Sequence, residues 1–243
     1  MNKDKLFKSG TIPEDFTFND KVAEVFDDML NRSVPYYSGV IDGIAELLRH
    51  QAPKNHTIYD LGCSTGTTLL ELARRLPDMN CQFIGIDNAP AMINKARLKA
   101  EMFSKSHAIS FTEDDIITAK LDGAGVILCN YTLQFIRPMT RLQFVHKLYN
   151  ALPTGGMCIV SEKIISHDKK LNREFINIYH QFKRQQGYSE LEIAAKREAL
   201  ENVLVPFSIE ENIDLLRQAG FQSVETFFQW FNFVSFVALK QPE

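Results

Sequence analysis

The sequence predicts an α/β fold built on a mostly parallel sheet, and three observations lead to this prediction. Short apolar segments alternate with segments of helical periodicity between residues 57 and 162. The stretch between successive apolar segments is long enough for a crossover helix, as parallel neighbours require. Polar residues that suit ligand binding follow four of the apolar segments, and ligands of such sheets bind at the carboxyl ends of the strands. We therefore expect a ligand site along one edge of the sheet.

Length and composition fit a single globular unit, and we expect one domain over residues 1–243. The net charge is −3 and the pI is about 6.1, so no general basic field favours direct binding of nucleic acid. The N-terminus lacks the apolar core of a signal peptide and no apolar run reaches the length of a membrane span, which predicts a cytoplasmic protein without a membrane partner. The four cysteines form no C-x-x-C pair and the six histidines show no metal-like spacing, so we expect reduced thiols and no metal.

Two helices are predicted ahead of the first strand. Asn19 or Asp20 is a suitable cap for the first helix, and the second spans about residues 36–50. We interpret residues 1–52 as a helical cover for the mouth of the ligand cleft. Tyr37 lies at the start of the second helix, where it can reach a ligand carboxylate, although packing alone would also explain a tyrosine there.

The alternating part of the chain accounts for five strands and the helices between them. The predicted strands are residues 57–61, 81–86, 108–112, 124–129 and 156–162. The predicted helices are about residues 66–76, 90–104 and 137–151. Pro90 and Pro138 lie near the starts of the last two helices, where the missing N–H costs little. Right-handed crossovers would place the carboxyl ends of these strands along the same edge.

The alternation stops at residues 163–206, where two extra helices are predicted at 171–186 and 190–203. We interpret this insertion as a lid or a dimerisation element. Beyond it, Ser208 caps one more helix. The last two predicted strands are residues 223–228 and 231–239. They form a hairpin-like pair that adds an antiparallel strand to the sheet, and we expect its aromatic residues to pack in the core.

The loop after the first strand, Gly62-Cys63-Ser64-Thr65-Gly66, is open to three interpretations. A dinucleotide site would prefer G-x-G-x-x-G, but Ser64 stands at the second glycine. A serine hydrolase elbow reads G-x-S-x-G, which the loop matches, yet no His-Gly-Gly segment precedes it. An S-adenosylmethionine (SAM) site has an acid followed by spaced glycines, matched by Asp60, Gly62 and Gly66. Asp87 ends the second strand and can accept hydrogen bonds from ribose hydroxyls, which favours the SAM interpretation.

Three further segments at strand ends suit other parts of a SAM molecule. Asn88 lies next to Asp87 on the adenine side. The Asp115 carboxylate can accept from the adenine amino group, and the Ile116 amide can donate to a ring nitrogen. Asn130, after the fourth strand, can hydrogen-bond the methionine end. Each segment alone would pass for a solvated turn or a strand-end cap, so it is their convergence that predicts the site.

Six segments spread over essentially the whole chain resemble the carboxy-S-adenosylmethionine synthase family of the class I SAM-dependent methyltransferases. They are Phe18–Arg32 with Ser33-Val34-Pro35-x-Tyr37, Tyr59-Asp60-Leu61-Gly62-Cys63-Ser64-x-Gly66, Gly85-Ile86-Asp87-Asn88, Leu128-Cys129-Asn130-Tyr131-Thr132-Leu133-Gln134-Phe135, Gly187-Tyr188-Ser189-Glu190 and Lys196-Arg197-x-Ala199-Leu200-Glu201-Asn202. The resemblance implies the Rossmann-like class I methyltransferase fold, with a mostly parallel seven-stranded sheet whose last strand is antiparallel. It also implies that Ser64 is this family's own form of the loop.

The resemblance implies an unusual activity. Enzymes of that family convert SAM and prephenate to carboxy-SAM and phenylpyruvate, and a separate enzyme then uses carboxy-SAM to build 5-oxyacetyl uridine at the tRNA wobble position. By the same resemblance, Arg197 contacts the new carboxylate, either within its own chain or from the partner subunit of a homodimer. The residues that the resemblance assigns to SAM are Tyr37, Gly62, Cys63, Ser64, Asp87, Asn88, Asp115, Ile116 and Asn130.

Spacing alone does not separate carboxyl transfer from methyl transfer, and no protein base is evident, which leaves a proton acceptor derived from the substrate. Two alternatives therefore stay open: a conventional methyltransferase acting on a small molecule or tRNA, and a SAM-binding protein without catalysis. The first is weakened by the missing Asn/Asp-Pro-Pro-aromatic motif of amino methyltransferases, since Asn130-Tyr131-Thr132-Leu133 stands at that place.

Overall fold

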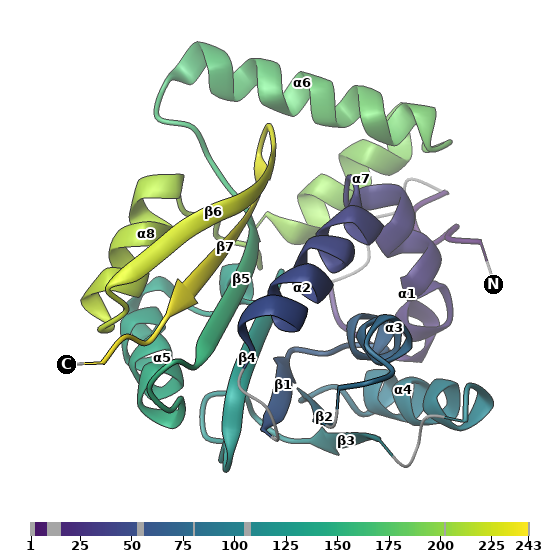
Figure 1. The fold of residues 1–243 in the computed structure, drawn as a ribbon. Helices are drawn as coiled ribbons and strands as arrows, with labels where there is room; N and C mark the ends of the chain where they lie inside the picture. Colours follow the sequence, from purple (N-terminus) through teal and green to yellow (C-terminus); the bar gives the residue numbers. More distant parts are fainter. Residues whose placement is uncertain are drawn as a thin grey trace.

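Helices cover both faces of a seven-stranded sheet in the computed structural model, which describes residues 3–8, 16–52, 56–79, 81–104, 108–201 and 203–242 (Figure 1). The strand order is β3-β2-β1-β4-β5-β7-β6. The strands are β1 (Thr57–Leu61), β2 (Gln82–Asp87), β3 (Ile109–Glu113), β4 (Ala124–Asn130), β5 (Met157–Lys163), β6 (Ser223–Trp230) and β7 (Phe233–Leu239). Strands β1 to β5 pair in parallel, and β7 is antiparallel to both β5 and β6. The predicted sheet is thus confirmed over the described part of the chain.

The helices divide between the two faces of the sheet. They are α1 (Asp20–Ser33), α2 (Tyr37–Gln51), α3 (Thr67–Arg75), α4 (Pro90–Met102), α5 (Pro138–Ala151), α6 (Lys169–Gln185), α7 (Glu190–Leu200) and α8 (Ile209–Gln218). Buried side chains of α2, α3 and α4 pack on one face, and those of α5 and α8 pack on the other. A 3-10 turn after β4, η1 (Leu133–Phe135), was not predicted from the sequence.

The side chains of alternate residues in each central strand pack into two separate apolar cores, one on each face of the sheet. In β4, Val126 and Leu128 pack toward α2 and α3, while Ile127 and Cys129 pack toward α5 and α8. Because both faces of the parallel strands are covered, the strands read as continuous apolar runs rather than as alternating ones. Cys129 lies in this interior, and Cys63 and Cys158 are likewise buried and reduced, as predicted.

The predicted element ends agree with local chemistry at most positions. Asn19 caps α1, with its side chain accepting from the Val22 amide at 3.1 Å, and Ser208 caps α8 in a capping box with Glu211. β7 begins at Phe233 rather than residue 231, because Phe231 turns back with φ 46°. Residues 1–2 and 9–15 of the predicted N-terminal cover, and residue 202 of the predicted insertion, lie outside the described residues.

The N-terminal helices and the insertion meet at the end of α1, in what we call the Ser33 joint. The Tyr179 hydroxyl of α6 donates to the Ser33 carbonyl at 2.9 Å, and the Lys196 ammonium of α7 donates to the Ser33 hydroxyl at 2.8 Å. Arg32 donates to the Gln186 carbonyl at 2.8 Å. These bonds hold α6 and α7 over the same side of the molecule as α1 (Figure 1). The interpretation of the insertion as a lid or dimerisation element stays a prediction.

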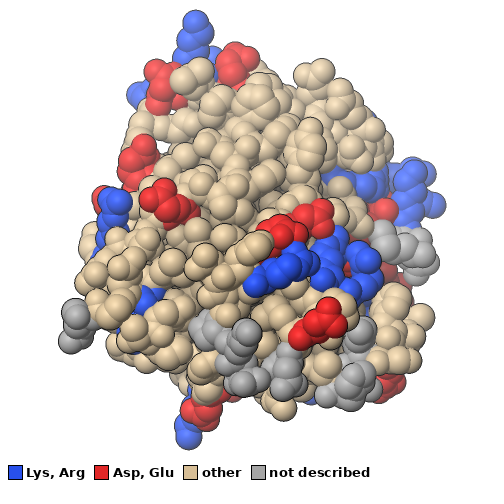
Figure 2. Space-filling model, in the orientation of Figure 1, with Lys and Arg blue, Asp and Glu red and all other residues tan. Residues whose placement is uncertain are grey.

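Acidic and basic side chains are interspersed on the face shown in Figure 2. On helices α2 and α3, for example, Arg75 forms ion pairs with Asp42 (2.7 Å) and with Glu71. Charged groups of both signs lie at the upper end of this face, where α6 lies in Figure 1, and the middle of the face is mostly uncharged. Within the described ranges, none of the helices has the length and apolar character that crossing a membrane requires.

Candidate active site

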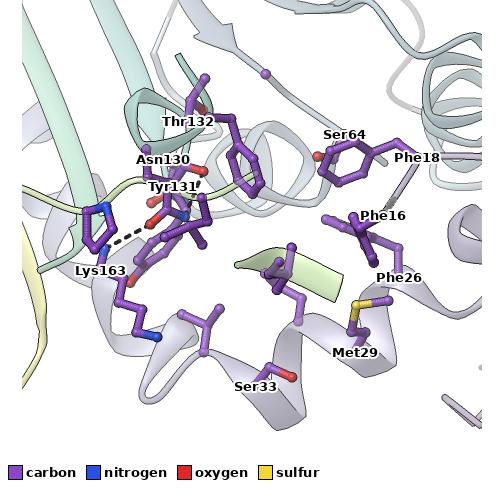
Figure 3. Close-up of a pocket in the computed structure, with 18 of the residues that line it drawn as sticks. Phe16, Phe18, Phe26, Met29, Ser33, Ser64, Asn130, Tyr131, Thr132 and Lys163 are labelled. Atoms are coloured by element: carbon purple, nitrogen blue, oxygen red, sulfur yellow. Dashed lines mark hydrogen bonds between the residues drawn. The ribbon is translucent and has the colours of Figure 1, made fainter. Parts of the chain in front are cut away.

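A cavity of about 710 Å³ lies at the carboxyl ends of the parallel strands. Figure 3 shows its two facing walls. The apolar wall includes Phe16, Phe18, Phe26 and Met29. The opposite, more polar wall includes Asn130, Tyr131 and Lys163, with the Lys163 side chain directed into the cavity (Figure 3). The cavity is therefore bounded by the sheet on one side and by the N-terminal segment and α1 on the other.

The structure brings all the residues predicted for the site to this one cavity. They are Tyr37, Gly62, Cys63, Ser64, Asp87, Asn88, Asp115, Ile116, Asn130 and Arg197. Their individual roles stay predictions, since only their placement is given by the geometry. The sequence left open whether Arg197 acts within its own chain or across a dimer, and in this structure its side chain lines the cavity of its own chain.

The loop between β1 and α3 owes its shape to three residues with positive φ: Gly62 at 75°, Ser64 at 49° and Gly66 at 73°. A Cβ on Gly62 would lie 2.8 Å from Thr132, and one on Gly66 would lie 2.5 Å from the Phe111 ring, so both positions require glycine. Ser64 takes the same left-handed conformation at some cost in strain, and its amide donates to Asp87 at 2.9 Å. This explains how a serine replaces the middle glycine without changing the loop.

We expect different outcomes when these two loop positions are changed. Gly66→Ala should lower the free energy of unfolding by about 1–3 kcal/mol, because the new methyl group overlaps Phe111. Ser64→Gly should change that free energy by less than about 1 kcal/mol, because relief of left-handed strain offsets the greater freedom of glycine in the unfolded chain. Urea unfolding of both variants measures the difference. Equal destabilisation of the two would contradict the assignment of strain to this loop.

A partly buried network anchors the loop to helices α1 and α4, and sequence reasoning missed it. The hydroxyls of Thr65 and Thr67 donate to Asp27 Oδ1 at 2.6 and 2.7 Å. The Lys99 ammonium donates to Asp27 Oδ2 at 2.7 Å and to Thr67 Oγ1 at 2.6 Å. Burial alone would raise the pKa of Asp27, but the Lys99 charge and these hydrogen bonds lower it. Asp27 is thus ionised and holds the loop against the N-terminal cover.

Two carboxylates, at the ends of β1 and β2, differ in how many hydrogen bonds their oxygen atoms accept. Asp87 accepts from the amides of Ser64 and Ala89, both at 2.9 Å, so its carboxylate is fixed in orientation. Asp60 is 2% exposed, and its Oδ1 atom has no hydrogen-bond partner among the described residues. Burial raises the pKa of Asp60 to about 7, and the charge of Asp87 adds to the rise. Asp60 therefore has an acceptor free for a ligand.

Asn130 presents a second free acceptor in the same cavity. Its amide nitrogen donates to Thr68 Oγ1 at 3.3 Å, and the Tyr37 hydroxyl shares a 2.7 Å hydrogen bond with the same oxygen. The Asn130 Oδ1 atom is buried and has no partner within the described chain. Burial raises the pKa of Tyr37, and the charge of Asp60 adds to the rise. Two orphaned acceptors of this kind suit a ligand that carries N–H donors.

The loop after β3 is held in place by its own hydrogen bonds and by a lysine of α5. The Asp115 carboxylate accepts from the Ile117 amide at 2.9 Å. The Lys147 ammonium of α5 donates to the carbonyls of Ile116 (2.8 Å) and Ile117 (3.0 Å). These contacts fix the segment whose amide and carboxylate were predicted to bind adenine. Lys147 is a positioning residue that the sequence did not reveal, because the pairing depends on how α5 packs.

The cavity also contains basic residues to which the sequence analysis gave no role, among them Lys163, Lys183 and Lys196. They come from β5, α6 and α7, so only the fold brings them together. Over the described ranges, no group of three or more His, Cys, Asp or Glu residues is arranged to hold a metal ion. The arrangement can therefore bind a nucleoside-type ligand with an ammonium group at one end of the cavity and anions at the other.

Solved structures of methyltransferases share this fold. A putative SAM-dependent methyltransferase from Methanococcus maripaludis superposes with a TM-score of 0.64, covering 96% of this chain and 98% of that chain at 16% identity. Human N-acetylserotonin methyltransferase, solved in complex with SAM, gives a TM-score of 0.64 over 92% of this chain and 56% of that chain, again at 16% identity. At such identities the likeness supports the fold alone, and it confirms the predicted class I methyltransferase fold.

Relatives found by sequence similarity identify the family, which the likeness to solved structures does not. Residues 58–156 match the family described as "Methyltransferase domain". The carboxy-S-adenosyl-L-methionine synthase of Desulfotalea psychrophila is 55% identical over 241 residues, which cover 99% of this chain and 98% of the relative. The enzyme of the same name from Nitratiruptor is 46% identical over 243 residues, with both chains fully covered. The chain therefore belongs to the carboxy-S-adenosyl-L-methionine synthase family.

Proposed function

We propose that this enzyme converts SAM and prephenate into carboxy-SAM and phenylpyruvate. Family membership supports the reaction, and one observation supports the substrates: orphaned buried acceptors and cations without acidic partners line the same cavity. The acceptors, Asp60 Oδ1 and Asn130 Oδ1, suit the ammonium of SAM. The cations suit carboxylates, of which prephenate has two.

The proposed reaction balances without an added oxidant or reductant. Prephenate loses its ring carboxylate as carbon dioxide and its ring hydroxyl as hydroxide, and the ring becomes aromatic. The hydroxide takes a proton from the SAM methyl group, which the sulfonium acidifies, and leaves as water. The ylide carbon then forms a C–C bond to carbon dioxide and gives carboxy-SAM. Because the released hydroxide accepts the proton, this scheme needs no protein base. The protein has to hold both substrates together and keep water out.

Each predicted residue has a place in this scheme. Asp87 binds the ribose hydroxyls, Asp115–Ile116 bind the adenine, and Asp60 and Asn130 hold the ammonium. Arg197 binds the carboxylate of the product. The remaining proposed SAM contacts are Tyr37, Gly62, Cys63, Ser64 and Asn88. The apolar wall of the cavity excludes water that would otherwise compete for the ylide.

We propose further that the carboxy-SAM product serves a separate enzyme that carboxymethylates the wobble uridine of tRNA. Under this proposal the present chain needs no contact with nucleic acid. The chain is proposed to act in the cytoplasm as a homodimer, with the helices of the insertion as candidates for the contact between subunits.

Binding of SAM should become tighter as the pH rises toward 7. In the free protein the pKa of Asp60 is raised to about 7, and a bound ammonium would lower it, so binding below this pH must release a proton. We expect the association constant for SAM to rise about tenfold per pH unit between pH 5.5 and 6.5. Calorimetry in buffers of different ionisation enthalpy measures both the constant and the released proton. In Asp60→Asn the slope should vanish, and a slope retained by this variant would exclude Asp60 as its source.

Mass spectrometry and turnover test the proposed function together. Purified protein incubated with SAM and prephenate should yield phenylpyruvate and a SAM-like ion heavier by one carboxyl group. S-adenosylhomocysteine in the presence of an acceptor would instead support a conventional methyltransferase. Unchanged SAM after binding, with prephenate intact, would support a non-catalytic SAM-binding protein. Either of the last two results would overturn the proposal.

A further inference from the structure

Three lysines at the insertion side of the cavity have no acidic partner. Lys183 and Lys196 are only 6% and 5% exposed, and Lys163 is half-buried. Within the described chain, none of the three forms an ion pair, and only Lys196 has a side-chain hydrogen bond, to Ser33. The ammonium groups of Lys163 and Lys183 lie 5.2 and 4.7 Å from the centre of the Tyr179 ring. Lys163 and Lys183 thus place positive charge against Tyr179, and the Lys196 ammonium lies 5.4 Å from the centre of the Tyr188 ring.

Several of the charged groups around these lysines are themselves basic. Arg197 acts on Lys163 as a like charge, and His180 is affected by both Lys163 and Lys183. Asp4 acts on both Lys183 and Lys196 but already accepts from the Tyr188 hydroxyl at 2.6 Å, and Asp28 also acts on Lys196. Burial lowers the pKa of Lys183 well below its usual value and that of Lys196 to about 8.

An unpaired buried cation is costly, so a stable fold keeps one only where something else compensates. A bound anion is the simplest compensation here, because Lys163, Lys183 and Lys196 all line the cavity that the ligand is expected to fill. A second anion site besides Arg197 also agrees with chemistry. A substrate that gives up one carboxylate and keeps another needs two separate cationic contacts.

We infer that Lys163, Lys183 and Lys196 bind the carboxylate that the second substrate keeps, whereas Arg197 binds the carboxylate that is transferred. This inference rests on the proposed function and adds a specificity rule to it. The acceptable donors of carbon dioxide are dicarboxylates, and their second carboxylate lies against Tyr179 between the lysines. Phenylpyruvate retains that second carboxylate, so it serves as a probe of the lysine site that does not depend on turnover.

Lys183→Met gives a test in which binding and stability move in opposite directions. Removal of an unpaired buried charge at nearly constant volume should raise the melting temperature of the ligand-free protein. The same change should weaken phenylpyruvate binding, measured by calorimetry, by about tenfold or more and raise KM for prephenate by a similar factor. The dissociation constant of SAM should stay within about twofold of the wild type. Lys170→Met, on the exposed side of the same helix, is the matched control and should change none of these quantities.

Two results would overturn the inference. The first is unchanged phenylpyruvate affinity in both Lys183→Met and Lys163→Met, the second variant being included in case the first does not fold. The second is a fall in melting temperature together with the loss of binding, which is the behaviour of a purely structural lysine. Failure of the proposed function looks different, since the wild type would then consume no prephenate. If the wild type consumes prephenate but KM for prephenate is unchanged in both variants, the inference about the lysines is wrong and the proposed function still stands.

Discussion

Asp27→Ala is expected to lower the free energy of unfolding by about 3 kcal/mol, because it leaves the largely buried Lys99 ammonium without its partner. It should also weaken SAM binding, since Thr65 and Thr67 lose the acceptor that fixes the loop. Chemical denaturation gives the first quantity. Calorimetry with SAM, at a temperature where the variant is folded, gives the second.

Two variants make the Asp27 result specific. Glu24→Ala, on the exposed side of the same helix, should change the free energy of unfolding by less than about 0.5 kcal/mol. The double variant Asp27→Ala/Lys99→Met should recover part of the lost stability, because neither charge is then left unpaired. A single variant as stable as the wild type would show that the network does not hold the loop.

Arg197→Ala is expected to retain SAM binding and to lose discrimination in favour of carboxy-SAM. The guanidinium lines the cavity and has no ion pair or hydrogen bond among the described residues, so it is available to a ligand carboxylate. A charge-assisted, two-pronged contact contributes about 1.5–3 kcal/mol, which corresponds to about 10- to 150-fold in affinity. Calorimetry with SAM and with carboxy-SAM measures both constants on the same preparation.

Arg173→Ala serves as the control for charge alone, because Arg173 is exposed on α6. It should bind both ligands as the wild type does. If Arg197→Ala binds carboxy-SAM as tightly as the wild type, Arg197 has no role toward the carboxylate. If Arg197→Ala also loses SAM, the side chain contributes to the general shape of the cavity, and the assigned selectivity is wrong.

The parts of the fold that the sequence predicted depend on local signals. The alternation of apolar and helical segments, the caps at Asn19 and Ser208 and the prolines at the starts of α4 and α5 act within a few residues of each other. The carboxyl ends of parallel strands must meet at one edge, so the convergence of Asp87 and Asn130 also followed from the pattern.

The parts that the sequence did not predict depend on pairs far apart in the chain. Asp27 and Lys99 are separated by 72 positions, and neither stands in a recognisable motif. Lys163 and Lys183 lie on a strand end and on an amphipathic helix, where a lysine ordinarily faces solvent. β7 begins two residues later than predicted, because the hairpin turns at Phe231 with positive φ. Only the packed structure distinguishes these residues from ordinary surface side chains.

The Ser33 joint has a consequence for the order in which the enzyme is assembled during synthesis. Ser33 bonds to residues 146 and 163 positions later, so α1 leaves the ribosome long before its partners exist. Strands β1 to β5 all precede α6 and α7 in the chain, whereas β6 and β7 follow them. A nascent chain that has paired its five parallel strands therefore still lacks the helices that close the ligand cavity, and it cannot yet hold its substrates.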